Sequence, residues 1–145
     1  MPQAAATPAA PYILLIEDHP GDVQLLTEAF ATNRSEVVIH AVATVKDAVL
    51  WLRGEGPPAS RRRPSLIVLD LILPGAPGTA ALVRLKATDA WRTIPVVVLS
   101  ASNRDEDRIE CSAYGAAQFM SKPHSFAGYL QCAADLQRAM PVRPH

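Results

Sequence analysis

Apolar residues along this chain gather in five short runs, and the segments between the runs have a helical spacing. The runs cover residues 12–16, 37–42, 66–69, 95–99 and 117–120, and most are apolar at every position rather than at alternate positions. An uninterrupted apolar run of this length is typical of a parallel strand that is covered on both faces. The runs therefore predict five strands of a parallel sheet.

Helices are predicted between the strands because apolar residues recur there at three- or four-residue spacing. Thr44 and Asp47 open the second helix in an arrangement similar to a capping box, and Asn103 and Glu106 stand at the start of the fourth helix with the same spacing. The last helix is expected to bury a stripe formed by Phe126, Leu130, Ala133 and Leu136. The predicted helices cover residues 22–31, 44–53, 79–86, 104–114 and 125–140.

A strand followed by a helix, repeated five times, predicts an α/β fold with one doubly wound, five-stranded parallel sheet and five helices. Right-handed crossovers favour the flavodoxin-like (CheY-like) strand order 2-1-3-4-5. In that order the strands at 12–16 and 66–69 lie on the two sides of the topological switch point, where ligands bind at the carboxyl ends of the strands. Functional residues are therefore expected just after these two strands.

The charge balance excludes a general attraction for polyanions. Lys and Arg together number 14, as do Asp and Glu, so neither nucleic acid nor an anionic membrane is an expected partner. Arg61, Arg62 and Arg63 lie in a polar connection at 54–64 that could be a partner or nucleic-acid patch. A solvated loop is favoured, because three charges on a neutral domain bind a duplex weakly.

Length and composition indicate one globular domain. The 145 residues are 49% apolar and 19% charged, which is ordinary for a folded domain with a real core. The folded part is expected at 12–140, with a disordered, Ala- and Pro-rich tail at 1–11 and a short C-terminal tail at 141–145.

A cytoplasmic location is expected. Cys111 and Cys132 lack the spacing of a metal site, and no secretory segment precedes them, which predicts free thiols in a reducing compartment. No apolar stretch approaches the length needed to span a bilayer.

Acidic residues stand where two of the predicted strands end. Glu17 and Asp18 follow the run at 12–16, and Asp70 follows the run at 66–69 ahead of a Pro-Gly turn. The carboxyl ends of parallel strands meet at one edge, so these three carboxylates come together, and their mutual repulsion favours a bound cation. His19 is next to the acids, but a single loop histidine is usually not a ligand.

Ser100 at the end of the fourth strand and Lys122 after the fifth complete the same edge. Acids, one hydroxyl and one ammonium suit Mg²⁺ together with a phosphoryl group, because Mg²⁺ takes one or two carboxylates, several waters and a phosphate oxygen. Asp18 and Asp70 can supply the carboxylates, and the backbone carbonyl of Ile72 is within reach of the same ion.

The ordered set Glu17-Asp18, Asp70, Ser100 and Lys122-Pro123 resembles the receiver domain of two-component response regulators, the CheY-like family. The resemblance covers about residues 12 to 140 and implies a stand-alone regulator. It implies that Asp70 attacks a phosphohistidine on a sensor histidine kinase and becomes an aspartyl phosphate. Asp18 would then bind Mg²⁺ directly and Glu17 through a coordinated water, while Lys122 would pair first with Asp70 and then with a phosphoryl oxygen.

The resemblance also implies a switch. Ser100 would bind a phosphoryl oxygen and pull the following loop inward, and Phe119 would rotate from outside to inside. The altered surface would be that of helix 104–114, strand 117–120 and helix 125–140, which is also the expected homodimer face. Phe119 stands where Tyr is common, so a switch that uses a tyrosine hydroxyl is not available.

Three other classes fit the sequence less well than a receiver. A phosphatase of the haloacid dehalogenase type also phosphorylates an aspartate, but it needs a second acid at position 72, where this chain has Ile72. A flavodoxin-like FMN site needs hydroxyls and amides where this chain has acids and a proline. A pseudo-receiver that only docks partners is disfavoured because every phosphorylation residue is present. Within the family, the long loop before the third strand and the segment at 96–103 are similar to receivers paired with bacterial phytochromes.

Overall fold

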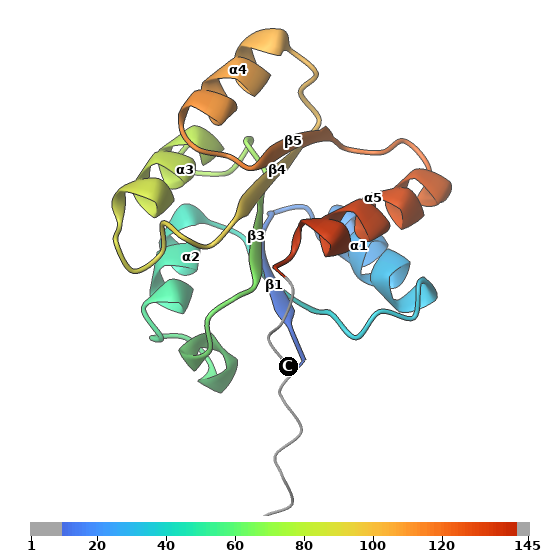
Figure 1. Ribbon diagram of the computed structural model, residues 1–145, viewed down its shortest axis with the longest axis horizontal. Helices are drawn as coiled ribbons and strands as arrows, with labels where there is room; N and C mark the ends of the chain where they lie inside the picture. The colour runs from blue at the N-terminus through green and yellow to red at the C-terminus, as the bar shows by residue number, and fades with distance from the viewer. Residues whose placement is uncertain (1–9, 142–145) are drawn as a thin grey trace, which may run out of the picture.

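Five parallel strands form one sheet in the order β2-β1-β3-β4-β5, in a computed structural model that describes residues 10–141 (Figure 1). The predicted fold class and strand order are both confirmed. The predicted tails fall outside the described residues, except for residues 10, 11 and 141. The strands are β1 (Tyr12–Ile16), β2 (Val38–Val42), β3 (Leu66–Leu69), β4 (Val96–Ser100) and β5 (Gln118–Ser121).

The helices begin and end within two residues of the predicted positions. Thr44 caps the second helix by accepting a hydrogen bond from the backbone nitrogen of Asp47, at 3.0 Å, as its sequence predicts. The helices are α1 (Pro20–Thr32), α2 (Val45–Leu52), α3 (Gly78–Ala87), α4 (Asp105–Ala113) and α5 (Phe126–Ala139).

Alternate residues of the central strands supply two separate cores. In β1, Ile13 and Leu15 face α1 and α5, whereas Leu14 and Ile16 face α2 and α3 (Figure 1). Strands β1, β3 and β4 are buried along their whole length, and the outer strands β2 and β5 are partly exposed. Burial of both faces explains the uninterrupted apolar runs.

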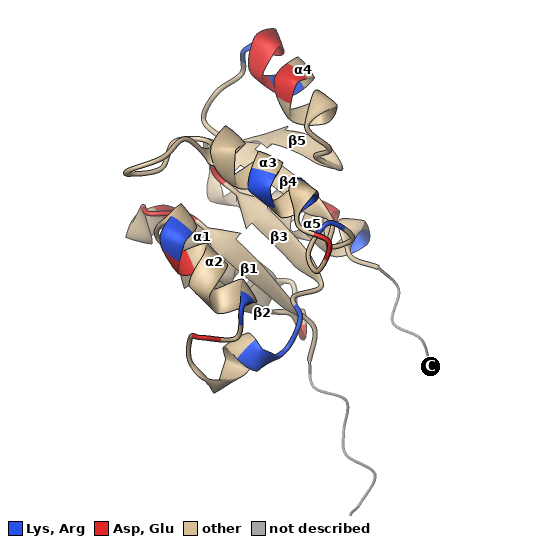
Figure 2. Ribbon diagram, turned by 90° about the vertical axis from the view of Figure 1, so that its left-hand side faces the viewer, with Lys and Arg blue, Asp and Glu red and all other residues tan. Residues whose placement is uncertain are grey.

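Helix α4 is attached to the domain more loosely than the others. Its one buried residue is Cys111, while Ile109 is 68% exposed. The first turn carries Asp105, Glu106 and Asp107, which form the acidic end of the helix in Figure 2. Acidic residues in the first turn stabilise a helix through its dipole, so α4 depends more on local interactions than on buried area.

Two details of the helix predictions were wrong. Asn103 does not cap α4, because the Ser102 hydroxyl accepts the hydrogen bond of the Arg104 backbone nitrogen and the helix begins at Asp105. Phe126 is 38% exposed rather than buried, because the stripe of α5 that packs against α1 and the sheet starts one turn later. The buried residues of α5 are Tyr129, Cys132, Ala133 and Leu136.

The Arg61–Arg63 segment is exposed, as expected of a solvated loop, but it is also bound to the rest of the domain. The connection contains a short 3₁₀ helix, Pro58–Arg61, and two of its guanidinium groups bind the protein itself. Arg62 lies over the ring of Tyr12 and donates to the carbonyl of Ala10, and Arg63 donates to the carbonyl of Ala90. These arginines bind backbone carbonyls at the edge of the sheet opposite to the acids.

Among residues 10–141, no helix is both long and apolar enough to cross a membrane.

Candidate functional site

Glu17 and Asp70 lie side by side where the two central strands end. Ile16 pairs with Leu69 in the sheet, and the backbone nitrogen of Asp70 donates to the carbonyl of Ile16 at 3.0 Å. This register brings the next residues, Glu17 and Asp70, to the same level of the carboxyl edge. Each carboxylate is only 3% exposed, so both charges are held away from bulk water.

Lys122 reaches this pair from the loop after β5. Its Nζ donates to Glu17 Oε1 at 2.5 Å, to Asp22 Oδ2 at 2.8 Å and to Asp70 Oδ2 at 3.1 Å. Burial alone would lower the pKa of Lys122, but the hydrogen bonds to three carboxylates raise the pKa above its ordinary value. The ammonium is therefore charged and uses its donors on acids.

One ammonium does not neutralise this edge. Burial, together with the neighbouring Asp70 carboxyl, raises the pKa of Glu17 to about 7, although Lys122 limits the rise. The hydrogen bond to Glu17 and the charge of Asp18 likewise raise the pKa of the His19 imidazole. The Glu17 shift comes mainly from burial, whereas the His19 shift comes from the neighbouring carboxylates, whose negative charge a divalent cation would offset.

Asp18 has the oxygen that such a cation needs. Its Oδ1 is shielded from solvent and forms no hydrogen bond with the described residues. Ligand atoms of Glu17, Asp18, His19 and Asp70 all lie within 4.8 Å of one another, so they surround a space in which one ion could be held. Buried oxygen atoms that lack a partner are costly unless an ion or water binds them, and hard oxygen ligands suit Mg²⁺. The donor set therefore fits the Mg²⁺ implied by the family resemblance.

Asp22 is part of this cluster and was missed in the sequence. The helix was expected to begin at Asp22, but α1 begins two residues earlier, because Pro20 fits the first helical position, where no N–H is needed. Asp22 thus lies in the first turn of the helix, and its carboxylate reaches Lys122. Burial would raise the pKa of Asp22, but the hydrogen bond with Lys122 holds it below its usual value. The four-residue spacing of Asp18 and Asp22 was the signal available.

The loop after Asp70 is held tightly at both ends. Asp70 Oδ1 accepts a hydrogen bond from the backbone nitrogen of Ile72 at 3.1 Å, and the backbone nitrogen of Gly78 donates to the carbonyl of Leu71 at 2.9 Å. The first bond fixes one carboxylate oxygen of Asp70 while Lys122 holds the other. The side chain of Ile72 is 61% exposed and stands close to Asp70 in the chain.

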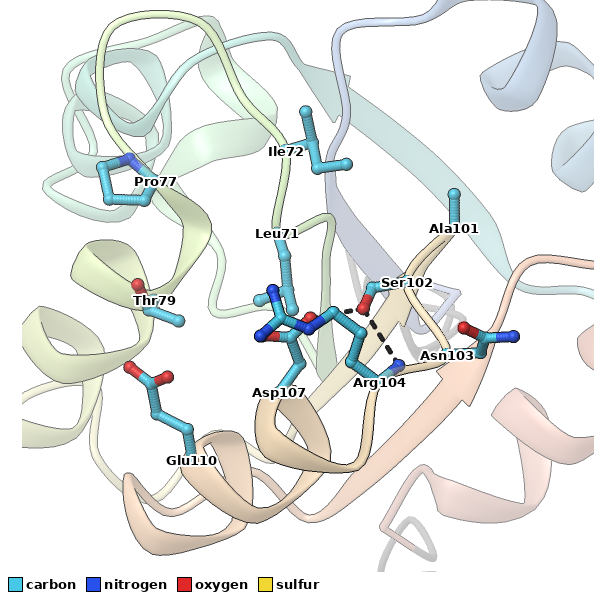
Figure 3. Close-up of a pocket in the computed structure, with 10 residues that line it drawn as sticks. All are labelled: Leu71, Ile72, Pro77, Thr79, Ala101, Ser102, Asn103, Arg104, Asp107 and Glu110. Atoms are coloured by element: carbon cyan, nitrogen blue, oxygen red, sulfur yellow. Dashed lines mark hydrogen bonds between the residues drawn. The ribbon is translucent and has the colours of Figure 1, made fainter.

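A cleft of about 600 Å³ opens beside this loop, between α3 and α4 (Figure 3). Leu71 and Ile72 line one side and Asp107 and Glu110 of α4 the other. The Ser102 hydroxyl donates to the Asp107 carboxylate across the start of α4, so the loop between β4 and α4 is tied to the helix. The cleft therefore lies between the loop that follows Asp70 and the helix that is most loosely attached.

Ser100 and Phe119 occupy the positions expected for them in the fold. Ser100 is fully buried, its hydroxyl accepts from the backbone nitrogen of Ser102 at 3.3 Å, and its carbonyl accepts from the backbone nitrogen of Lys122 at 2.8 Å. Phe119 is half-buried, and the Arg108 guanidinium of α4 lies 4.9 Å from the centre of its ring. Ser100 is therefore linked to Lys122, and Phe119 to α4.

Comparison with known proteins places this chain in a family. The model of the response regulator receiver domain matches residues 13–132. The chain therefore belongs to the response regulator receiver domain family of two-component signalling.

Its relatives include response regulators of phytochrome systems. Response regulator Rcp1 of Synechocystis sp. is 35% identical over 100 residues, which cover 67% of this chain and 66% of Rcp1. The crystal structure of the phosphorylated cyanobacterial phytochrome response regulator RcpA has 30% identity and a TM-score of 0.82, and the match covers 91% of this chain and 94% of RcpA. RPA3017, a response regulator in red light signalling of R. palustris, has 25% identity and a TM-score of 0.82 over 92% of this chain and 99% of RPA3017.

Proposed function

We propose that this receiver domain accepts a phosphoryl group on Asp70, in a Mg²⁺-dependent reaction, from the phosphohistidine of a sensor histidine kinase. The observation that carries the proposal is that Asp70 and Asp18 lie next to each other in complementary states. Asp70 is buried and oriented by Lys122, and beside it Asp18 has a shielded oxygen without a hydrogen bond from the described residues. A fixed nucleophile next to an oxygen suited to a metal ion is the arrangement that phosphoryl transfer requires.

Asp70 Oδ2 is the nucleophile. Its lone pair attacks phosphorus while the phosphorus–nitrogen bond of the donor breaks, and the leaving imidazole keeps the electron pair and takes up a proton. The product is an acyl phosphate on Asp70. Lys122 then moves its hydrogen bond from Asp70 Oδ2 to a phosphoryl oxygen, and Ser100 donates its hydroxyl to another. Bound Mg²⁺ would neutralise charge on the phosphoryl oxygens.

Asp18 and Asp70 would hold the metal ion directly, Glu17 would act through a bound water, and the carbonyl of Ile72 would supply a further oxygen. Glu17 suits the indirect role because one of its oxygens already accepts from Lys122 and the other from the backbone nitrogen of Asp18 at 3.1 Å. Asp22 would keep Lys122 in place while its partners change.

The output surface of the proposal is formed by α4, β5 and α5. Ser100 would draw in the loop that Ser102 ties to α4, and Phe119 would turn inward, away from Arg108. Support comes from the loose attachment of α4, since a weakly packed helix costs little to move. The same face would form a homodimer.

The kinase of the proposal is a bacteriophytochrome. Support comes from the relatives, since RcpA is a phytochrome response regulator and RtBRR, with 29% identity and a TM-score of 0.70, is a bacteriophytochrome response regulator. The match to Rcp1 covers 66% of that protein, so the identity of the kinase is proposed and not inferred from the match alone.

The test of this function is the intact mass of the protein after incubation with acetyl phosphate. We expect a gain of one phosphoryl group with Mg²⁺, no gain with EDTA, and no gain in Asp70→Asn under either condition. Asp135→Asn on α5 is the control, because Asp135 lies away from the acidic edge and its carboxylate pairs with Arg138. An equal mass gain in Asp70→Asn would overturn the assignment.

Slow hydrolysis of the acyl phosphate is a further expected property. The side chain of Ile72, two residues after Asp70, is exposed but offers no polar group to orient a water molecule at Asp70. We expect Ile72→Asn to shorten the lifetime of the phosphorylated protein roughly tenfold. Decay followed by mass after removal of the donor measures this, with Ile109→Asn, a similarly exposed isoleucine on α4, as the control. Unchanged or slower decay in Ile72→Asn would contradict it.

A further inference from the structure

His19 adds a nitrogen to an edge otherwise formed by oxygen ligands. Its Nδ1 lies 3.3 Å from Asp18 Oδ1, 3.4 Å from Glu17 Oε2 and 4.0 Å from Asp22 Oδ2. The imidazole is therefore directed toward the acids and not toward solvent alone, although 58% of the side chain is exposed.

The oxygen nearest to this nitrogen is the one without a hydrogen bond. Asp18 Oδ1 is shielded from solvent, and the described residues offer it no hydrogen bond, even though His19 Nδ1 is 3.3 Å away. An ion bound between the two atoms would give Asp18 Oδ1 the partner that it lacks, and would replace the hydrogen bond between His19 Nδ1 and Glu17 Oε2. The same ion could contact Asp70 directly and Glu17 through a bound water, because the ligand atoms of all four residues lie within 4.8 Å of one another.

The backbone holds His19 in this place. His19 precedes the first residue of α1 in an extended conformation, with φ −91° and ψ 109°, and Pro20 starts the helix. Because proline has a fixed φ and follows directly, the chain has little freedom to carry His19 away from Asp18. The side chain is exposed enough to turn, so the nitrogen can adjust to an ion without moving the backbone.

We propose that His19 is a metal ligand, so that this site binds first-row divalent transition ions through one imidazole nitrogen and carboxylate oxygens, in addition to Mg²⁺. Imidazole suits transition ions, whereas Mg²⁺ prefers oxygen ligands and water. The proposal deepens the proposed function, on which it rests, because it presupposes that Asp18 and Asp70 bind the ion of the phosphorylation site. The competing arrangement is an imidazolium that only pairs with the acids and touches no metal.

Electron spin echo envelope modulation spectroscopy of bound Mn²⁺ distinguishes these arrangements, since a directly bound imidazole nitrogen gives a ¹⁴N modulation of the echo. We expect the modulation in the wild-type protein and in His124→Asn, and its loss in His19→Asn. His124 is the matched control because it is an exposed histidine in the loop after β5, outside the group of ligand atoms. Calorimetry should show Ni²⁺ binding weakened about tenfold in His19→Asn while Mg²⁺ affinity changes less than about twofold.

The possible outcomes distinguish a failure of the His19 assignment from a failure of the proposed phosphorylation site. Mn²⁺ bound with no nitrogen modulation, and equal Ni²⁺ affinity in wild type and His19→Asn, would overturn the role of His19 and leave the phosphorylation site standing. Mn²⁺ binding that Asp18→Asn does not weaken would overturn the metal site itself, and the role of His19 with it. Circular dichroism spectra of the variants establish that each is folded.

Discussion

Replacing Gly78 with alanine is expected to destabilise the domain and to displace Asp70. A Cβ at position 78 would lie 2.3 Å from the carbonyl oxygen of Asp70 and 2.6 Å from the Cα of Leu71. These are backbone atoms, so the clash cannot be relieved by a side-chain rotation. Overpacking of this kind costs about 1–3 kcal/mol, and here the strain falls on the nucleophile. Urea unfolding and the rate of phosphorylation by acetyl phosphate measure the two effects.

The direction of the stability change in Gly78→Ala distinguishes a clash from the ordinary helix preference for alanine. Alanine is ordinarily better than glycine in a helix by roughly 0.5–1 kcal/mol, so a substitution without a clash should stabilise. Gly21 in α1 provides the control, because a Cβ there meets nothing within 4 Å. We expect Gly21→Ala to unfold at the same or higher urea concentration and Gly78→Ala at a lower one. If both variants were as stable as the wild type, the close approach of α3 to Asp70 would be wrong.

Replacing Lys122 with methionine is expected to change metal affinity and phosphorylation in opposite directions. The ammonium pairs with the carboxylates of Glu17 and Asp70 beside the proposed metal site, so its removal should tighten Mg²⁺ binding on the order of tenfold, as expected for loss of a nearby positive charge. Phosphorylation should slow by about 10²–10³, because a donor that stabilises the developing charge on the phosphoryl group is lost. Calorimetry and time-resolved intact mass measure the two quantities.

Lys86→Met is the control for this pair of effects. Lys86 also donates to two oxygens, the carbonyls of Arg92 and Ile94, but these precede β4 and lie at the opposite end of the sheet. Its removal should leave both Mg²⁺ affinity and phosphorylation as they are. Weaker Mg²⁺ binding in Lys122→Met would show that the lysine does not compete with the metal, and an unchanged rate would remove it from the reaction.

The fold could be predicted from the sequence because burial determines which residues a strand can contain. Strands β1, β3 and β4 are covered on both faces, so each is an unbroken apolar run, and their order follows from the handedness of the crossovers. The acidic site residues could be identified in the sequence for a related reason. Carboxylates such as Asp70 are rarely buried at a strand end without a partner or a ligand, so their positions stood out.

The parts that were missed depend on helix starts and close contacts, which leave weaker signals. The role of Asp22 depends on α1 beginning at Pro20, because this start places Asp22 within the first turn, where its carboxylate reaches Lys122. Gly78 carries no signal in the sequence, since what excludes a side chain is the carbonyl of Asp70, on the other side of the intervening loop. The binding of Arg63 to the carbonyl of Ala90 likewise joins segments that no local pattern connects.

The most direct test of the account is to locate the phosphoryl group after phosphorylation with Mg²⁺ and acetyl phosphate. Borohydride reduces an aspartyl phosphate to homoserine, so peptide mass spectrometry then identifies the modified position. The account predicts homoserine at position 70 alone, and none when Mg²⁺ is chelated. Homoserine at position 18 or 22 with Asp70 unmodified would contradict it.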